Sequence, residues 1–355
     1  MVNGKIKVLI VDDSVLFREV LARGLSEDPE IKIVGKASNP FQARDMIIKY
    51  SPDCLTCDIQ MPRMNGIEFV RQLIPQYPLP VIVVSTISDA IFDAMNAGAV
   101  DFITKPEGNR ISSMEDFIAE LRSKIKIATK AKVKKSIKTI TKPIFESNKI
   151  DEKKIIAIGA STGGTEALYS VLRNLPENIP GIVIVQHIPP VFSKMFAERM
   201  NTQTSLNVKE AQGNEVIEPG KVFIAPGDKH LVIKKIGQIF KTDIVPGDKV
   251  NGHCPSVDKL FFSVAKECGA NSIGVILTGM GQDGAKGLLE MRKNGAVTIG
   301  QDEKTSVVYG MPKVAYETGA VEKQFALETI PDAIKMASKL IKKKINNCEK
   351  GESYQ

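Results

Sequence analysis

With 355 residues, the chain is more than twice the usual domain length of about 150, so we expect two domains. Its composition, 43% hydrophobic and 25% charged, is that of a globular protein, and no apolar run approaches the roughly 18 residues of a membrane span. The net charge of +7 arises mainly from lysines in residues 124–154, with few aromatic residues among them. Nucleic-acid binding and membrane insertion are therefore not expected. The first residues lack a signal-peptide pattern, which favours a cytoplasmic protein.

Residues 6–106 alternate short β-branched runs with amphipathic stretches, beginning KVLIVD, VLFREVLARGLSE, IKIVGKA and NPFQARDMIIKY. This alternation is typical of a doubly wound parallel α/β sheet. Acidic residues end two of the strand patterns: Asp12 and Asp13 follow KVLIV, and Asp58 follows CLTC. Because the carboxyl ends of parallel strands meet at one edge, we expect the three carboxylates to form one pocket. Such a pocket suits Mg²⁺ and a phosphoryl group.

Two further strand ends carry residues that fit a phosphate-handling pocket. Ser85 ends the strand VIVV and can donate a hydrogen bond to a phosphoryl oxygen. Lys105 follows DFIT and can neutralise the phosphoryl charge. Any one of the acidic residues alone is more simply interpreted as a helix cap. The complete set favours a functional site.

Together, these residues resemble the receiver domain of bacterial two-component response regulators, over about residues 5–125. The motifs that carry the resemblance are Asp12-Asp13, Asp58-Ile-Gln-Met-Pro-Arg-Met-Asn-Gly66, Ser85 and Thr104-Lys105-Pro106. The resemblance implies a flavodoxin-like fold in which Asp58 accepts a phosphoryl group from a histidine kinase. It implies that Asp12, Asp13 and Asp58 bind Mg²⁺, that Ser85 senses the phosphoryl group and Lys105 contacts it, and that Phe102 is the aromatic switch residue. Asn65 stands where many receivers have Asp.

Residues 126–152 are rich in lysine, with apolar residues spaced among the basic ones and a break at Lys142-Pro143. This composition favours a solvated tether that follows the last helix of the first domain. An amphipathic basic helix attracted to an anionic surface is the alternative.

A strand pattern restarts at KKIIAIG and is followed by a serine on a turn that opens the amphipathic stretch TEALYSVLRNL. Residues 159–163 match G-x-S-x-G, in which a strand-to-helix turn exposes a nucleophilic Ser161. A serine before a helix is by itself more often an N-cap, and glycine-rich turns also bind dinucleotides. The next strand, IVIV, ends in Gln186-His187 rather than in an acidic residue, which favours a nucleophile over a dinucleotide site.

A histidine and a carboxylate at neighbouring strand ends complete a possible triad with Ser161. His187 is suited to take the serine proton at neutral pH. Asp283, in the turn after SIGVILT, is suited to orient the imidazole, and the Met280 N–H in the same turn to stabilise an oxyanion. His230 begins another strand and His253 precedes Cys254-Pro255-Ser256, interpreted as a helix start with Pro at its first position; both rank below His187 as the base.

The second half resembles the chemotaxis protein-glutamate methylesterase family over about residues 153–345. The segments that carry the resemblance are IAIGASTGGTEAL, VIVQHIPPVFSKMFAERM, FIAPGDKHLVI, CPSVDKLFFSVA, GVILTGMGQDGAKGL and IGQDEKTSVVYGMP. The resemblance implies hydrolysis of glutamate methyl esters on chemoreceptors with release of methanol, and deamidation of receptor glutamines. It implies that Ser161 is the nucleophile, His187 the base, Asp283 its orienting residue and Met280 an oxyanion contributor, with Thr162 assisting and no cofactor for the esterase.

The sequence thus predicts two doubly wound parallel-sheet domains joined by a basic linker: a flavodoxin-like receiver and a Rossmann-like methylesterase domain. We place the receiver at residues 1–125, the linker at 126–152, the catalytic domain at 153–347 and a polar tail at 348–355. We expect the unphosphorylated receiver to lie over Ser161 and to release it on phosphorylation of Asp58. A non-catalytic scaffold is the alternative of another class. A DNA-binding regulator is remote, because no basic recognition helix follows the linker.

Overall fold

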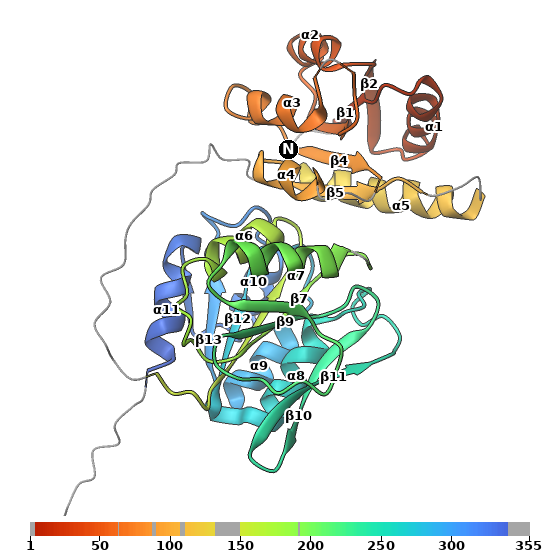
Figure 1. The fold of residues 1–355 in the computed structure, drawn as a ribbon. Helices are drawn as coiled ribbons and strands as arrows, with labels where there is room; N and C mark the ends of the chain where they lie inside the picture. The colour runs from red at the N-terminus through yellow and green to blue at the C-terminus, as the bar shows by residue number, and fades with distance from the viewer. Residues whose placement is uncertain are drawn as a thin grey trace, which may run out of the picture.

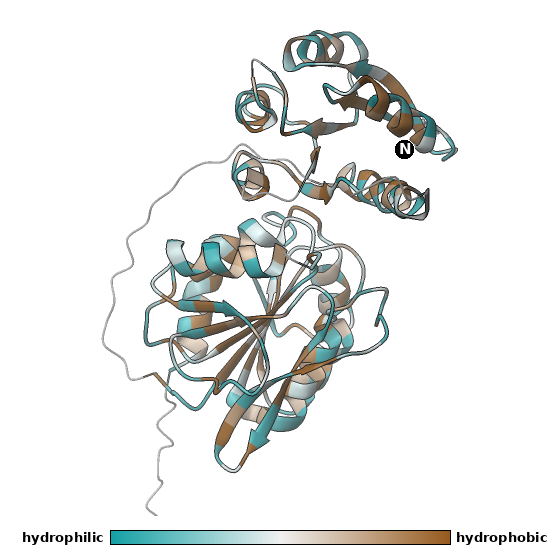
Figure 2. Cartoon of the chain, turned by 45° about the vertical axis from the view of Figure 1, so that its right-hand side comes forward, coloured by the Kyte–Doolittle hydropathy of each residue, from teal (hydrophilic) through white to brown (hydrophobic). Residues whose placement is uncertain are grey.

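The computed structural model describes residues 4–62, 64–86, 90–106, 111–131, 150–190 and 192–339. These ranges form two α/β domains, each built on a parallel sheet with helices against its faces (Figure 1). The central strands of both parallel sheets are strongly hydrophobic, as expected for strands buried on both faces (Figure 2). The two-domain parallel α/β fold predicted from the sequence is confirmed. Most of the expected linker and all of the expected tail lie outside the described residues.

The N-terminal domain is a five-stranded parallel sheet in the order β2-β1-β3-β4-β5. Its strands are β1 (Ile6–Val11), β2 (Ile31–Ala37), β3 (Cys54–Asp58), β4 (Val81–Ser85) and β5 (Asp101–Thr104). Its helices are α1 (Val15–Ser26), α2 (Pro40–Tyr50), α3 (Gly66–Leu73), α4 (Ala90–Asn96) and α5 (Ile111–Ala128). The strand order is that of flavodoxin-like sheets, with a topological switch point between β1 and β3. The last helix, α5, continues past the expected domain end at residue 125.

Local sequence explains how the helices of this domain begin. Ser14 caps α1 by accepting a hydrogen bond from the Phe17 N–H, and Asn65 caps α3 by accepting one from the Glu68 N–H. Asn65, which departs from the usual receiver pattern, therefore has a structural function that Asp would serve equally well.

The C-terminal domain contains a seven-stranded parallel sheet in the order β14-β13-β12-β6-β7-β9-β8. Its strands are β6 (Ile155–Ala160), β7 (Ile182–Gln186), β8 (Asn207–Glu210), β9 (Lys221–Ile224), β12 (Ser272–Ile276), β13 (Val297–Gln301) and β14 (Lys323–Phe325). Its helices are α6 (Gly164–Leu172), α7 (Phe192–Gln203), α8 (Val257–Cys268), α9 (Ala285–Lys293), α10 (Met311–Glu317) and α11 (Ile330–Ala337). The chain leaves β6 toward β7 and later returns to β12 on the other side, so a switch point lies between β6 and β12.

An antiparallel hairpin stands apart from the seven-stranded sheet. It consists of β10 (His230–Ile236) and β11 (Ile239–Val245), paired over their whole length. The doubly wound pattern predicted from the sequence did not include a hairpin. The alternation of His230–Ile236 fits a two-stranded ribbon with one covered face, because Leu231 and Ile233 are buried while Ile236 is exposed.

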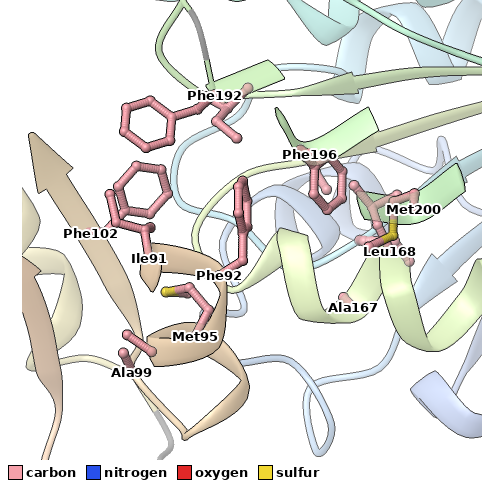
Figure 3. Close-up of a cluster of buried hydrophobic side chains, with 14 of the residues drawn as sticks. Ile91, Phe92, Met95, Ala99, Phe102, Ala167, Leu168, Phe192, Phe196 and Met200 are labelled. Carbon is pink, nitrogen blue, oxygen red and sulfur yellow. The ribbon is translucent and has the colours of Figure 1, made fainter. Parts of the chain in front are cut away.

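The receiver meets the C-terminal domain through α4 and β5, which lie against α6 and α7 (Figures 1 and 3). Phe92 on α4 stacks on Phe196 of α7, with ring centroids 5.8 Å apart. Phe102 on β5 contacts Phe192, at the start of α7, with centroids 4.9 Å apart. All four aromatic side chains are buried, so a single apolar cluster continues from one domain into the other.

Candidate active site and phosphorylation site

Ser161 follows β6 on a sharp turn that leads into α6. Its N–H donates to the Thr278 carbonyl at 3.0 Å, and its own carbonyl accepts from the Gly164 N–H at 2.6 Å. Gly163 has φ +74°, a conformation that favours glycine, and a Cβ there would lie 2.7 Å from Val307. These contacts fix a strand-to-helix turn that presents the Ser161 side chain at the N-terminus of α6, where partial positive charge gathers.

The loop after β12 lies against the nucleophile. A Cβ on Gly279 would approach the Ser161 Cβ to 2.7 Å, so only glycine allows this closeness. Met280 follows, and no other described residue accepts a hydrogen bond from its backbone N–H. The Met280 side chain lines a separate cavity of about 360 Å³, together with Lys130 and Tyr309. The predicted oxyanion donor thus directly follows the glycine that lies against Ser161, and its N–H has no acceptor among the described residues.

His187 lies directly after β7, the neighbour of β6, and its N–H donates to the Ala160 carbonyl at 3.1 Å. Its Nε2 is 2.9 Å from Asp283 Oδ2, and only 7% of its side chain is exposed. The other ring nitrogen, Nδ1, is buried and makes no hydrogen bond to any described residue. A neutral imidazole that donates from Nε2 to Asp283 carries its lone pair on Nδ1. In this structure no hydrogen bond joins that nitrogen to the Ser161 hydroxyl.

Asp283 is buried in the loop after β12 and accepts hydrogen bonds on both carboxylate oxygens. Besides His187, the donors are Ser256 Oγ at 2.8 Å, the Val257 N–H at 2.7 Å, the Asp258 N–H at 3.2 Å and Asn251 Nδ2 at 2.8 Å. Burial alone would raise its pKa, but the hydrogen bonds from His187, Asn251 and Val257 outweigh burial and hold the pKa below the ordinary value. Asp283 is therefore ionised at neutral pH.

The sequence analysis missed Asn251, Ser256 and the start of α8 as partners of Asp283. Ser256 is the N-cap of α8, and Pro255 stands before the cap in a cis peptide bond, not at the first helical position as predicted. The Asn251-Gly252 pair is a recognisable turn signal, but its contact with Asp283 arises only from the tertiary fold.

The two other histidines have different surroundings. His230 is buried, with Nε2 on the Asp248 carbonyl at 3.0 Å and Nδ1 accepting from the Ser256 N–H at 3.2 Å. Both of its nitrogens are occupied, which indicates a structural residue. His253 lies flat on the His187 ring, with centroids 3.7 Å apart and planes 12° apart.

In the receiver, Asp12, Asp13 and Asp58 meet at the carboxyl ends of β1 and β3, as predicted, with carboxylate oxygens within 4.8 Å of one another. Lys105 Nζ bridges two of them, at 2.8 Å from Asp12 Oδ2 and 2.6 Å from Asp58 Oδ2. Three carboxylates with two of them buried form a hard oxygen donor set that fits Mg²⁺. When bound, Mg²⁺ would neutralise charge on the phosphoryl oxygens, and these three residues would hold it.

Asp58 is buried, and burial raises its pKa, although Lys105 opposes the shift. Its other oxygen accepts a single backbone hydrogen bond, from the Gln60 N–H at 3.2 Å. Ser85 is buried at the end of β4, and the Lys105 N–H donates to its carbonyl at 2.8 Å. The predicted phospho-acceptor and the predicted switch residue Ser85 therefore share one edge of the sheet.

A cavity of about 980 Å³ separates the Ser161 turn from β5 and α5 of the receiver. Its walls include Ser161 and His187 from one domain and Phe102 and Lys124 from the other. Thr162, the residue after the serine, donates from its hydroxyl to Asp101 Oδ2 of β5 at 3.3 Å. The receiver thus closes one side of the candidate active site.

The fold and the two sites define a class of protein: a response regulator whose output domain carries a serine, a histidine and an aspartate at the edge of a parallel sheet. A family model described as CheB methylesterase matches residues 156–334, and one described as response regulator receiver domain matches residues 8–114. The chain belongs to the CheB methylesterase family, with a receiver domain at its front. The family predicted from the sequence is confirmed.

Two relatives match this chain over nearly its whole length. A protein of Syntrophomonas wolfei named protein-glutamate methylesterase/protein-glutamine glutaminase 2 is 54% identical over 93% of this chain and 97% of its own length. A relative with the same enzyme name from Syntrophotalea carbinolica is 46% identical over 93% of this chain and 97% of its own. The crystal structure of the Thermotoga maritima CheB methylesterase catalytic domain matches with 41% identity and a TM-score of 0.50, covering 51% of this chain and 96% of that one.

A search of the described helices finds none that combines the length and the apolar character of a membrane span.

Proposed function

We propose that this protein hydrolyses glutamate methyl esters on chemoreceptors by a serine mechanism and that phosphorylation of its receiver activates it. The observation that carries the proposal is the meeting of Ser161, His187 and Asp283 at the carboxyl edge of β6, β7 and β12, beneath the receiver. The full-length relatives named as protein-glutamate methylesterases support the substrate class.

The first half of the reaction forms an acyl-enzyme. Ser161 Oγ bonds to the ester carbonyl carbon while His187 Nδ1 takes the hydroxyl proton. The bond from carbon to the methoxy oxygen then breaks, and His187 returns the proton to that oxygen, so methanol leaves. Asp283 accepts a hydrogen bond from Nε2 throughout and stabilises the imidazolium, because it is already ionised and fixed by four other donors.

The second half transfers the acyl group to water. His187 Nδ1 takes a proton from water, the water oxygen bonds to the carbonyl carbon, and the bond to Ser161 Oγ breaks as the proton returns to the serine. The Met280 N–H and the N-terminus of α6 stabilise the oxyanion in both halves, a role supported by the close approach of the neighbouring Gly279 to Ser161. The same steps applied to a glutamine side chain release ammonia, which gives the glutaminase activity named for the relatives.

In the unphosphorylated state, the receiver inhibits the hydrolase by covering it. Phe92 and Phe102 are packed on α7, Asp101 holds the Thr162 hydroxyl, and the Ser161 hydroxyl is not hydrogen-bonded to His187. We infer that a phosphoryl group on Asp58 draws Lys105 and Ser85 toward its oxygens and that this shift moves β5 with Phe102. Loss of the Phe102 and Asp101 contacts then frees Thr162 and opens the cavity to a receptor helix.

The partners that follow from this scheme are a chemotaxis histidine kinase as phosphodonor and methyl-accepting chemoreceptors as substrate. Both meet the protein in the cytoplasm, where the methylated receptor helices lie. The receiver and methylesterase family matches support this scheme in outline.

The test is methanol release from glutamate-methylated chemoreceptor by the full-length protein, with and without a small-molecule phosphodonor and Mg²⁺. We expect release to rise with the phosphodonor by about 5- to 150-fold, the usual range of coupling between two sites. Ser161→Ala should abolish release in both conditions, and Asp58→Asn should keep basal release while losing the stimulation. Equal release from Ser161→Ala would rule out the serine mechanism, and no release by the unaltered protein would favour a scaffold.

A further inference from the structure

A tight turn at residues 250–253 contacts two members of the candidate triad. The Val250 N–H donates to the His253 carbonyl and the His253 N–H to the Val250 carbonyl, both at 2.9 Å. Between them, Asn251 and Gly252 have φ values of +52° and +84°. An Asn-Gly pair with positive φ at both positions is the favoured two-residue connection of antiparallel strands, so the sequence itself specifies this turn.

Two side chains of this turn contact two different members of the triad. Asn251 Nδ2 donates to Asp283 Oδ1 and to Asp258 Oδ2, at 2.8 Å each. His253 covers one face of the His187 imidazole, with ring centroids 3.7 Å apart and planes 12° apart. Because the turn is closed by its own backbone hydrogen bonds, it fixes the His253 ring relative to the Asp283 carboxylate. The His187 ring is therefore held at its Nε2 by Asp283 and on its face by His253.

The geometry of the stack favours one charge state of His187. Two neutral aromatic rings prefer offset or edge-to-face arrangements with larger centroid separations than this one. A cation over the face of a neutral ring is attracted by the π electrons. The face-to-face stack is therefore better suited to the state in which His187 is an imidazolium than to the state in which both rings are neutral.

His253 itself stays neutral at physiological pH. Burial lowers its pKa to about 4, and the adjacent His187 acts in the same direction. The other charged groups that face it are Asp283, which favours its charged form, and Lys249 and Lys124, which oppose it. A neutral ring therefore lies against His187 when that residue becomes positively charged.

We propose that His253 is a positioning residue: its neutral ring stabilises the His187 imidazolium formed during proton transfer and keeps Nδ1 turned toward Ser161. This inference rests on the proposed function and assigns one more residue to that site. The stabilisation appears when His187 gains the serine proton, so it belongs to the transition state rather than to substrate binding. His253 should therefore affect kcat and leave KM unchanged.

The experiment compares His253→Leu with His253→Phe in the full-length protein, assayed for methanol release at saturating phosphodonor and Mg²⁺. Leucine fills a similar volume and excludes water but has no π face, whereas phenylalanine keeps a flat ring without nitrogens. We expect His253→Leu to lower kcat by about 3- to 30-fold at unchanged KM, and His253→Phe to stay within about 2-fold of the unaltered enzyme. Phe262→Leu, an exposed aromatic residue on α8, is the matched control and should change neither parameter.

The pH profile gives a second readout that a merely structural residue would not move. Loss of the π face disfavours protonated His187, so the acid limb of kcat/KM should shift to lower pH in His253→Leu and stay in place in His253→Phe. Equal kcat in His253→Leu and the unaltered protein would overturn the inference.

Two other outcomes would also overturn it. A kcat of His253→Phe as low as that of His253→Leu would mean that the ring nitrogens act directly, and a raised KM alone would assign His253 to substrate binding. If His253→Leu does not fold, a folded His253→Phe variant with kcat lowered more than 10-fold still contradicts the proposed role of the stacked ring. Failure of the proposed function is recognised separately, by release from the unaltered protein that is absent or independent of Ser161.

Discussion

The receiver site and the hydrolase site both depend on a buried aspartate at the switch point of a parallel sheet, but the two carboxylates differ in their partners. Asp283 accepts five hydrogen bonds, four of them from groups other than His187, and its pKa is lowered. Asp58 accepts one from the Gln60 N–H and one from Lys105, and burial raises its pKa. The carboxylate of Asp283 therefore has its hydrogen-bonding positions filled and is held in one place, whereas the carboxylate of Asp58 can still accept a new group.

The difference matches the functions that we propose for the two sites. A group that orients a base has the same task in every cycle, and complete hydrogen bonding gives it one position and one charge. A group that accepts a phosphoryl must change its charge and partners, and a complete shell of donors would oppose that change. Lys105, which joins Asp58 to Asp12, is the contact that a phosphoryl group can redirect.

The strongest test of this comparison is Asp283→Asn, which removes the charge from the saturated site. The amide cannot both accept from His187 Nε2 and satisfy the donors at the start of α8, so the imidazole loses its working tautomer. We expect kcat for methanol release to fall by roughly 10³- to 10⁴-fold, as for other triads. Asp258→Asn, in a neighbouring buried aspartate that does not contact His187, is the control and should lose far less activity.

The same variant has a pH-dependent effect on stability. Because the folded pKa of Asp283 is lower than the ordinary aspartate value of 3.8, its contribution to stability is present above about pH 4 and is lost as the pH falls toward the folded pKa. Thermal unfolding should therefore show a gap in Tm between the unaltered protein and Asp283→Asn that is full at pH 7 and narrows below pH 4. A gap that stays constant down to pH 3 would contradict the ionised, saturated state of Asp283.

A smaller effect is expected from Phe92→Ala, which weakens the contact through which we propose that the two sites communicate. Phe92 is buried at 2% exposure between the domains, stacked on Phe196 and covered by the Arg199 guanidinium at 5.3 Å. Its truncation should raise basal methanol release by about 10-fold, within the usual range of coupling between sites, and should shrink the stimulation by phosphodonor accordingly. Phe41→Ala, exposed on α2 of the same domain, should leave both unchanged. Unchanged basal release in Phe92→Ala would mean that this contact does not inhibit.

Strand ends could be predicted from the sequence because their chemistry is local. Asp12, Ser161 and His187 each follow a strand rich in β-branched residues, and Asp58 ends the buried strand β3. Parallel strands bring such ends together without further information. The donors to Asp283 could not be predicted in the same way, since Asn251 lies 32 residues from it in the chain. Only the tertiary fold makes them neighbours.

The domain interface also could not be predicted from sequence patterns. The buried side chains of α4, including Phe92, have the pattern of an ordinary amphipathic helix. This pattern does not show whether the apolar face of the helix packs on its own sheet or on a second domain. The hairpin β10–β11 shows the same limit, because its alternation resembles that of a strand in the main sheet. For α4 and for the hairpin, only the structure shows which surface the apolar face packs against.

A half-buried acid, Glu166, extends the comparison to a carboxylate in different surroundings. It lies in the first turn of α6, no other described residue donates a hydrogen bond to it, and Arg199 and Arg173 act on it only through longer-range attraction. Burial raises its pKa from the ordinary glutamate value of 4.5 to about 7, so the folded state favours its neutral form. The resulting stability is complete below about pH 4.5 and is lost as the pH rises through 7.

Glu166→Gln should therefore match the unaltered protein near pH 4.5 and exceed it in stability by about 1–2 kcal/mol at pH 8.5, where the glutamate must ionise. For a domain of this size, that difference corresponds to a few degrees in Tm, measurable by thermal unfolding at the two pH values. Glu177→Gln, at an exposed position after α6, is the matched control and should show no such pH-dependent gain. An equal gain at both pH values would show that the shape of the side chain at position 166, rather than its charge, determines the difference in stability. A gain confined to high pH would place Asp283, Asp58 and Glu166 in one series, in which the number of hydrogen-bond donors around a carboxylate decides whether it stays ionised and fixed, can accept a new group, or destabilises the fold when it ionises.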